Sequence, residues 1–273
     1  MGGKLIVFEG IPGSGKTTLH ERVVSELRRR GIGILETSEP TKEASDDNFF
    51  GVCIRKLIEQ QQISDQDYAN VCFSASKICR EGRRKKLPAA LRFGNELSDA
   101  VGKLANRRPL TELERQLFFI SDRWFHLREV VRPALERGLW VIMDRYELST
   151  VAHYRMNTSS KTDLLKHWQY PILGSDYVSP DITFVLDVSP ETAFKRQQES
   201  GKAIDIYEKK LRQMEHLYNG YEWAVSLFKH VESGDPRHGY PFVFLNAERS
   251  KEEIFKQALA HMPFEKSSKV LAS

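Results

Sequence analysis

A glycine-rich run near the start of the chain carries a lysine and a threonine at a spacing that suits phosphate chemistry. Residues 10–17 have the sequence G-I-P-G-S-G-K-T, which fits the pattern G-x-x-x-x-G-K-[ST]. Glycines let backbone N–H groups curl around phosphate oxygens. The run predicts that Lys16 contacts the β- and γ-phosphates of ATP and that the Thr17 hydroxyl ligates Mg²⁺. The residues expected to bind ATP are Gly10, Gly13, Ser14, Gly15, Lys16, Thr17 and Thr18.

A second candidate for phosphate chemistry follows an apolar run in the middle of the chain. Val141, Ile142 and Met143 lead directly into Asp144 and Arg145. A carboxylate at the end of a buried strand is expected to associate with magnesium in a phosphate-loop protein. Arg145 and Tyr146 follow this carboxylate directly. The sequence therefore predicts that Asp144 is a metal ligand and that Lys16 is catalytic.

The segments around these motifs indicate the scaffold that positions them. Short apolar runs alternate with longer segments that have helical spacing, which is typical of a doubly wound α/β fold with a parallel sheet. We therefore expect a single P-loop domain over residues 1–273. The expected strands are 4–9, 32–37, 139–143, 182–188 and 242–245, and the expected helices are 16–30, 111–137, 190–199, 207–228 and 251–261.

Residues 61–110 depart from this alternation, because they contain no clear strand and are strongly basic. Ten lysines and arginines face five acidic residues in this segment. Val71, Phe73 and Ile78, with Leu87 and Leu91, predict helices that rest one apolar face on the core. We expect a helical insertion with a structural or partner-binding role. Charged runs are usually solvated surfaces and aromatic residues are sparse here, so a nucleic-acid partner is not expected.

The composition is that of an ordinary globular protein, with a net charge of +4 and three cysteines in 273 residues. The cysteines lack the paired spacing of a metal site, which favours reduced thiols. No apolar run approaches the length of a membrane span, and the first residues lead straight into a strand and the phosphate loop rather than a signal peptide. We expect a cytoplasmic protein without a membrane partner.

Five elements in order resemble the thymidylate kinase family of nucleoside monophosphate kinases, over about residues 4–257. The opening run F-E-G-I-P-G-S-G-K-T-T is similar to the family's F-E-G-x-D-G-x-G-K-T-T. The other four are residues 39–41 (E-P-T), 117–124 (L-F-F-I-S-D-R-W), 144–152 (D-R-Y-E-L-S through an alanine) and 180–188 (P-D through D-V). The resemblance implies transfer of a phosphoryl group from ATP to a small nucleotide, with dTMP the first choice.

The resemblance also implies roles for residues of the acceptor site. Phe119 would stack on the pyrimidine ring, and Arg123 would donate to a base carbonyl. Arg145 would be catalytic, holding the acceptor phosphate and then neutralising the charge of the transferring group. Glu39 belongs to the E-P element. Lys42, two residues after Pro40, is a candidate for a second phosphate contact. Tyr154 stands where bacterial members have a glutamine beside the acceptor.

Residues 189–206 would form a lid over ATP, in which Arg196 and Lys202 are the candidates to supply charge to the transition state. Ile206 replaces an arginine of the family's lid, and the alternative arginine inside the phosphate loop is absent because that position is Gly13. Pro12 replaces an aspartate that contacts the sugar 3′-hydroxyl. The family commonly forms homodimers through helices that flank the sheet.

Three other functions remain open on the sequence. The acceptor can be another deoxynucleotide or a nucleoside on the same fold. The basic insertion is also compatible with an ATPase that acts on nucleic acid. The departures in the lid are compatible with a protein that binds ATP without turning it over.

Overall fold

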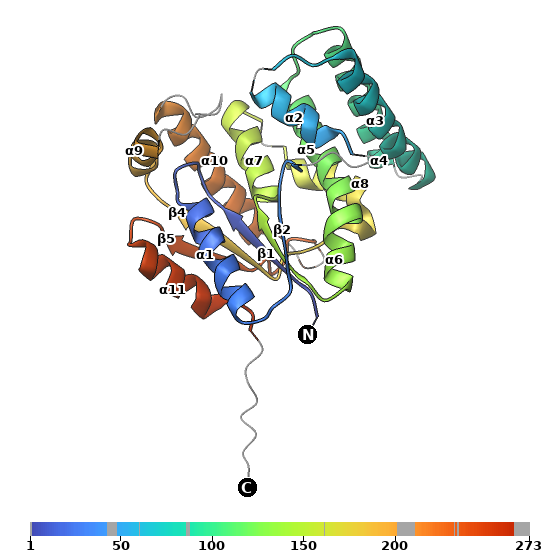
Figure 1. Cartoon of the computed structure of the whole chain (residues 1–273). Coiled ribbons are helices and arrows are strands. Elements are labelled where there is room, and N and C mark those ends of the chain that lie inside the picture. Colours follow the sequence, from blue (N-terminus) through green and yellow to red (C-terminus); the bar gives the residue numbers. More distant parts are fainter. Residues whose placement is uncertain are drawn as a thin grey trace.

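The computed structural model describes residues 2–42, 48–59, 61–85, 88–160, 162–200, 211–231, 233 and 235–264. In these ranges the chain forms a five-stranded parallel sheet with helices on both faces (Figure 1). The strand order is β2-β3-β1-β4-β5, so the chain starts in the middle of the sheet, places β2 and β3 on one side of β1, and places β4 and β5 on the other. This arrangement confirms the predicted doubly wound α/β fold.

The strands are β1 (Lys4–Glu9), β2 (Ile34–Ser38), β3 (Trp140–Asp144), β4 (Ile182–Asp187) and β5 (Phe242–Asn246). Strand β1 pairs with β3 on one side and with β4 on the other. In this register Phe8 lies opposite Asp144 on β3, so the phosphate loop and Asp144 leave the sheet at the same edge. The carboxyl ends of parallel strands are where open α/β sheets bind ligands.

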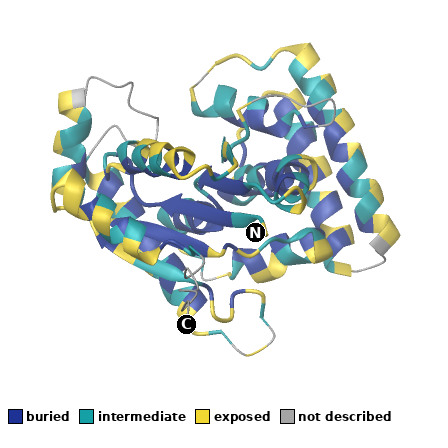
Figure 2. Ribbon diagram, turned by 60° about the horizontal axis from the view of Figure 1, so that its bottom comes forward, coloured by how far each residue is buried: buried dark blue, intermediate teal, exposed yellow. Residues whose placement is uncertain are grey.

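Side chains of β1 alternate between two apolar cores because successive residues of a strand point to opposite faces. Leu5 and Val7 pack in one core, and Ile6 and Phe8 in the other, all with no exposed surface. Figure 2 shows that the three central strands β1, β3 and β4 are buried along nearly their whole length. The second core includes α1 (Lys16–Arg29) and α11 (Lys251–His261), and the first includes α5 (Glu112–His126), η1 (Leu127–Val131) and α6 (Arg132–Glu136).

The segment expected to be one helix over residues 111–137 is divided in three. Thr111 begins α5 with a capping box, in which its side chain accepts from the backbone N–H of Glu114. The π-helical turn η1 then leads into α6, whose first turn contains Pro133. A proline has no N–H to donate to the preceding turn, so an uninterrupted α-helix cannot pass through this position without losing a hydrogen bond.

Several helices have no counterpart among the predicted elements. Helix α7 (Glu147–Asn157) packs closely along α10 (Leu211–Lys229), and most of its residues are buried. A helix covered on several sides lacks the one-sided apolar stripe by which a helix is recognised in sequence. The others are α2 (Phe50–Ile58), η2 (Leu165–Gln169), α8 (Tyr170–Leu173) and η3 (Gly174–Asp176).

The basic segment contains two long helices, α3 (Asp65–Lys85) and α4 (Pro88–Ala105), which pack against each other beside α2 and α5 (Figure 1). Val71 and Ile78 are fully buried, in agreement with the expected apolar stripe. Phe73 and Leu91, which were assigned to the same stripe, are instead 47% and 40% exposed. Phe73 is two residues from Val71, and this spacing places it on the opposite side of an α-helix. Leu87 lies outside the described residues.

Candidate functional site

A cavity of about 680 Å³ opens at the carboxyl edge of the sheet. The phosphate loop forms its floor, and Asp144 and Arg145 stand beside it. Helix α9 (Pro190–Ser200) and the segment after β5 supply the remaining walls. Its cations from outside the phosphate loop are Arg22, Arg145, Arg196, Arg249 and Lys251. The volume falls within the range of about 300–1,000 Å³ that encloses small ligands, and the cations suit a polyphosphate.

The phosphate loop is held by its own backbone and by α9. The Lys16 ammonium donates to the carbonyls of Gly10 and Ile11 at 2.7 and 3.1 Å. Gly13 has a φ of +78°, and a Cβ built there would lie 2.2 Å from the Ala193 carbonyl oxygen on α9. A side chain at position 13 is therefore excluded both by the backbone angle and by contact with α9.

Thr17 and Asp144 line the same cavity, as the magnesium prediction requires. Asp144 Oδ1 is buried and has no hydrogen-bond partner among the described residues. No cluster of three or more metal-ligating side chains occurs within those residues. Magnesium in phosphate-transfer sites is commonly held by one or two protein oxygens, with phosphates and water completing the shell. A hydroxyl, a carboxylate with an unsatisfied oxygen and a phosphate loop therefore fit this ion.

A second, smaller cavity of about 110 Å³ lies between α5 and α7. Phe119 and Arg123 on α5 and Thr150 and His153 on α7 form opposite walls, and Glu39 closes the end near β2. This volume is below that of sites enclosing a whole small molecule, so it fits a single ring better than a complete nucleotide. Its remaining lining residues are Pro40, Ile58, Gln116, Arg145, Tyr146 and Ser149.

Arg145 lines both cavities and stands between them. Its φ of +69° is uncommon for a residue with a side chain. Its backbone N–H donates to the Phe8 carbonyl at 3.0 Å, and its guanidinium contacts Ser149 Oγ and Tyr221 Oη at 3.2 and 3.0 Å. A strained backbone held by several contacts is a common feature of functional positions.

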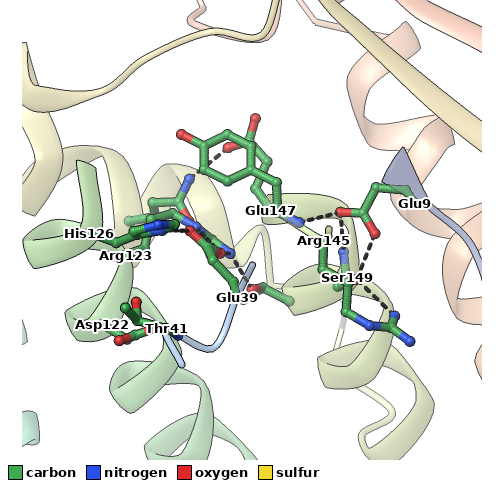
Figure 3. Close-up of polar contacts among 12 residues, drawn as sticks. Glu9, Glu39, Thr41, Asp122, Arg123, His126, Arg145, Glu147 and Ser149 are labelled. Carbon is green, nitrogen blue, oxygen red and sulfur yellow. Dashed lines mark hydrogen bonds and ion pairs between the residues drawn. The ribbon is translucent and has the colours of Figure 1, made fainter. Parts of the chain in front are cut away.

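Glu9 organises the chain around Arg145 from the end of β1. Its carboxylate accepts from the backbone N–H groups of Tyr146 and Ser149 at 2.7 and 3.2 Å. It also accepts from Ser149 Oγ and Tyr221 Oη at 2.6 and 3.0 Å. Burial raises the pKa of Glu9, whereas Ser149 and Arg145 lower it. Figure 3 shows Glu9, Ser149 and Arg145 gathered at the start of α7.

A second group of buried charges surrounds Arg123 at the second cavity (Figure 3). The Arg123 guanidinium donates to Glu39 Oε2 from Nε at 2.9 Å and from Nη2 at 2.5 Å. It also donates to Thr150 Oγ1 at 2.9 Å and to the Gln169 side-chain oxygen. Burial by itself raises the pKa of Glu39, but Arg123 and His126 outweigh it and hold that pKa below its usual value.

The second cavity is lined by most of the residues that the resemblance implies for the acceptor site. Phe119 lies on its wall, while Phe118 is fully buried against Phe50 with ring centroids 5.5 Å apart. Tyr154 lies elsewhere, 5% exposed in the apolar core, and the preceding residue His153 lines the cavity. Position 154 is 100° around the helix from position 153, enough to turn the side chain away from the cavity.

Two further candidates are not part of the described cavities. Lys42 is exposed, and its carbonyl accepts from Arg55. Lys202 and Ile206 lie outside the described residues, whereas Arg196 lines the phosphate cavity and donates to the Ala247 carbonyl at 3.0 Å.

Several residues of the site were not expected from the sequence. Glu9 could have been found, because a carboxylate at the end of a buried strand needs a specific partner. Tyr221, His153 and Gln116 carry no such local signal, since they reach the site only through the packing of α10, α7 and α5. Burial lowers the pKa of His153 to about 3, with Arg145 and Lys16 acting in the same direction, so its imidazole is neutral at physiological pH.

The parallel sheet, the phosphate loop and the arginine shared by two cavities define a P-loop phosphotransferase of the nucleoside monophosphate kinase class. The family model described as thymidylate kinase matches residues 8–87 and 75–257. The chain belongs to the thymidylate kinase family. No helix in the described ranges is long and apolar enough to cross a membrane.

Curated relatives match the chain over most of its length. The probable thymidylate kinase of Methanosarcina acetivorans is 27% identical over 94% of this chain and 93% of its own. The thymidylate kinase of Blochmanniella pennsylvanica is 24% identical over 96% of both chains. The thymidylate kinase of Methylococcus capsulatus is 31% identical over 73% of this chain and 71% of its own.

Proposed function

We propose that this chain transfers the γ-phosphoryl group of ATP to the 5′-phosphate of dTMP, forming dTDP and ADP. The observation that carries the proposal is the position of Arg145, whose side chain lines both the phosphate cavity and the acceptor cavity. A cation between donor and acceptor phosphates can hold the two groups in line and offset the charge of the transferring group. The family and the names of its members support the same reaction.

The reaction is a displacement at phosphorus. An oxygen of the acceptor phosphate forms a bond to the γ-phosphorus, and the bond from that phosphorus to the β–γ bridging oxygen breaks, which leaves ADP. Lys16 would contact the β- and γ-phosphates, and Arg145 would hold the acceptor phosphate. Bound Mg²⁺ would neutralise developing charge on the phosphate oxygens, and Thr17 and Asp144 are the residues placed to hold it. Phe119 would stack on the base.

Further features belong to the same proposal. The chain would act as one kinase domain, with residues 61–110 as a helical insertion and residues 189–206 as a lid over ATP. It would work in the cytoplasm as a homodimer with a nucleotide substrate. Arg196 on α9 is the described candidate for the lid cation, because it already lines the phosphate cavity.

Turnover by the purified protein tests the proposal. A coupled assay with Mg·ATP and separate dTMP, dUMP, dCMP, UMP and dGMP should give the highest specificity constant with dTMP. Lys16→Ala should abolish transfer, because the phosphate contact is lost together with the hydrogen bonds to the Gly10 and Ile11 carbonyls, and circular dichroism should show that the protein stays folded. Lys256→Ala is the matched control: this lysine is exposed on α11, and its loss should leave the rate unchanged.

A folded sample that binds ATP and turns over none of the five monophosphates would overturn the proposed function. A high rate with a nucleoside instead of a monophosphate would retain the kinase class and change the acceptor. Equal losses in Lys16→Ala and Lys256→Ala would show that the assay reports on protein quality rather than on phosphate binding.

A further inference from the structure

Gln116 lines the second cavity and has a buried hydrogen-bond acceptor. The residue is 2% exposed and lines the cavity together with Phe119 and Arg123, which follow it on the same face of α5. Its Oε1 is buried and has no hydrogen-bond partner among the described residues. A buried carbonyl oxygen without a partner costs free energy, so this atom marks a position where a donor from outside the chain fits.

Glu112 fixes which end of the Gln116 amide faces the cavity. Gln116 Nε2 donates to Glu112 Oε1 at 2.5 Å, and Arg115 Nε donates to the other carboxylate oxygen at 3.0 Å. Burial raises the pKa of Glu112, whereas Gln116 and Arg115 lower it, and a carboxylate oxygen that carries no proton can only accept a hydrogen bond. The amide nitrogen of Gln116 therefore points to Glu112, and its oxygen is the end of the amide that has no partner among the described residues.

Arg123, the residue that the resemblance assigns to the base, has little capacity left for it. Its bonds to Glu39, Thr150 and Gln169 number four in all. A guanidinium has five N–H groups, so one is left for a base. The buried carboxylate of Glu39 also ties Arg123 in place, because breaking this ion pair would leave a charge unpaired in the interior.

We propose that Gln116 Oε1 accepts the ring N3–H of a thymine or uracil base and so selects against cytosine. This inference rests on the proposed function, because it names the base that the acceptor site reads. Thymine and uracil carry a hydrogen on N3, whereas cytosine has a lone pair there that would face the carbonyl oxygen. Phe119, one helical turn further along α5, presents its ring beside the same cavity and can stack on the base that Gln116 reads.

Specificity constants for dTMP, N3-methyl-dTMP and dCMP in wild type and Gln116→Leu test the proposal. In wild type, N3-methyl-dTMP should be at least about tenfold worse than dTMP, since it offers no donor to a buried acceptor. In Gln116→Leu the acceptor is absent, and the two substrates should differ by no more than about threefold. The preference for dTMP over dCMP should shrink in the same variant.

Two further variants separate recognition from general damage. Glu112→Gln leaves Gln116 in place but removes the carboxylate that orients it, so the dTMP-to-dCMP ratio should fall mainly through KM. Gln257→Leu, at a half-buried position on α11 that lines neither cavity, should change neither ratio. If Gln116→Leu does not fold, Gln116→Met takes its place, and calorimetric binding of dTMP and N3-methyl-dTMP to the wild type gives the same comparison without a variant.

The outcomes distinguish this inference from the proposed function. Absence of dTMP turnover by folded wild type overturns both. Turnover of dTMP with the same dTMP-to-N3-methyl-dTMP ratio in wild type and Gln116→Leu overturns the inference alone, and means that the methyl group clashes elsewhere or that water satisfies Gln116. A wild type that uses dCMP as well as dTMP also overturns the inference while leaving the kinase function standing.

Discussion

Glu147, the first residue of α7, is a fully buried carboxylate whose charge is influenced by Arg123. Its side chain accepts from Gln169 at 2.6 Å, from Tyr177 at 2.8 Å and from Tyr170 at 3.3 Å. Burial nevertheless raises the pKa of Glu147 to about 7, since these donors and Arg123 only partly replace the lost hydration. Glu147 therefore changes charge close to neutral pH in the folded protein.

This position of the Glu147 pKa predicts a pH-dependent stability. Between pH about 4.5 and about 7 the folded protein holds a proton on Glu147 that the unfolded chain has released, so stability falls as pH rises. The loss amounts to about 3 kcal/mol and is complete above the folded pKa. The difference in unfolding free energy between wild type and Glu147→Gln should change by this order of magnitude across that range, measured by urea denaturation.

His153 acts in the opposite direction, which is why the difference between variants is the quantity to compare. Its pKa is lowered to about 3, so the unfolded chain binds a proton below pH about 6.5 that the folded protein refuses. Stability through His153 therefore rises with pH over the same interval. Both proteins contain His153, and its contribution cancels in the comparison. A difference that stays constant from pH 4.5 to 8 would contradict the prediction for Glu147.

At the scale of elements, α9 connects the phosphate loop to the end of β5. Its Ala193 carbonyl lies where a side chain on Gly13 would be, and Arg196 donates to the Ala247 carbonyl after β5. This contact explains why an arginine inside the phosphate loop does not fit this chain. Any cation that the lid supplies to the transferring phosphoryl group must come from α9 or from the residues that follow it.

Arg196 is the described residue of α9 best placed for this role, because it lines the phosphate cavity. Arg196→Ala should lower kcat by a factor on the order of 10³, as expected for a positioned cation in phosphoryl transfer. Lys195→Ala, an exposed position on the same helix, is the control and should leave kcat unchanged. A kcat for Arg196→Ala within about threefold of wild type would assign the charge to another residue, of which Lys202 is the next to test.

The contrast between predicted and observed elements has a physical basis. Strands β1, β3 and β4 are continuous apolar runs because both faces of the sheet are covered, and such runs are visible in sequence. The phosphate loop is visible because its chemistry is local. Gln116 and Tyr221 are not visible, since their roles depend on which helices pack together and on which oxygen is left without a donor. The resemblance assigns Tyr154 to the acceptor site, but a motif match does not say on which side of α7 a side chain lies.

At the scale of the whole molecule, α3 and α4 are part of the core rather than a separate lobe. Phe93 and Leu97 on α4 are fully buried in the same apolar cluster as Leu117 and Trp168. Helix α4 packs on α5, η2 and α8, and α3 packs on α2. Helices α3 and α4 thereby cover helices that flank the sheet on this side, and a second copy of the chain cannot contact the faces already covered.

The homodimer expected from the resemblance must then use a surface that remains exposed. Phe73, on the outer side of α3, is 47% exposed, and Phe244, on β5 at the opposite edge of the molecule, is 41% exposed (Figure 1).

We predict that sedimentation equilibrium gives twice the 31.5 kDa mass of one chain, with the α3–α4 pair at the interface. Phe73→Glu should weaken the dimer at least tenfold, since a carboxylate would have to lose its hydration at the interface even with Lys77 beside it, whereas Phe244→Glu should not. A protein that stays monomeric at every concentration would contradict the prediction. It would mean that α3 and α4 cover the surface that a second copy of the chain would otherwise contact. A dimer weakened only by Phe244→Glu would move the interface to the β5 edge.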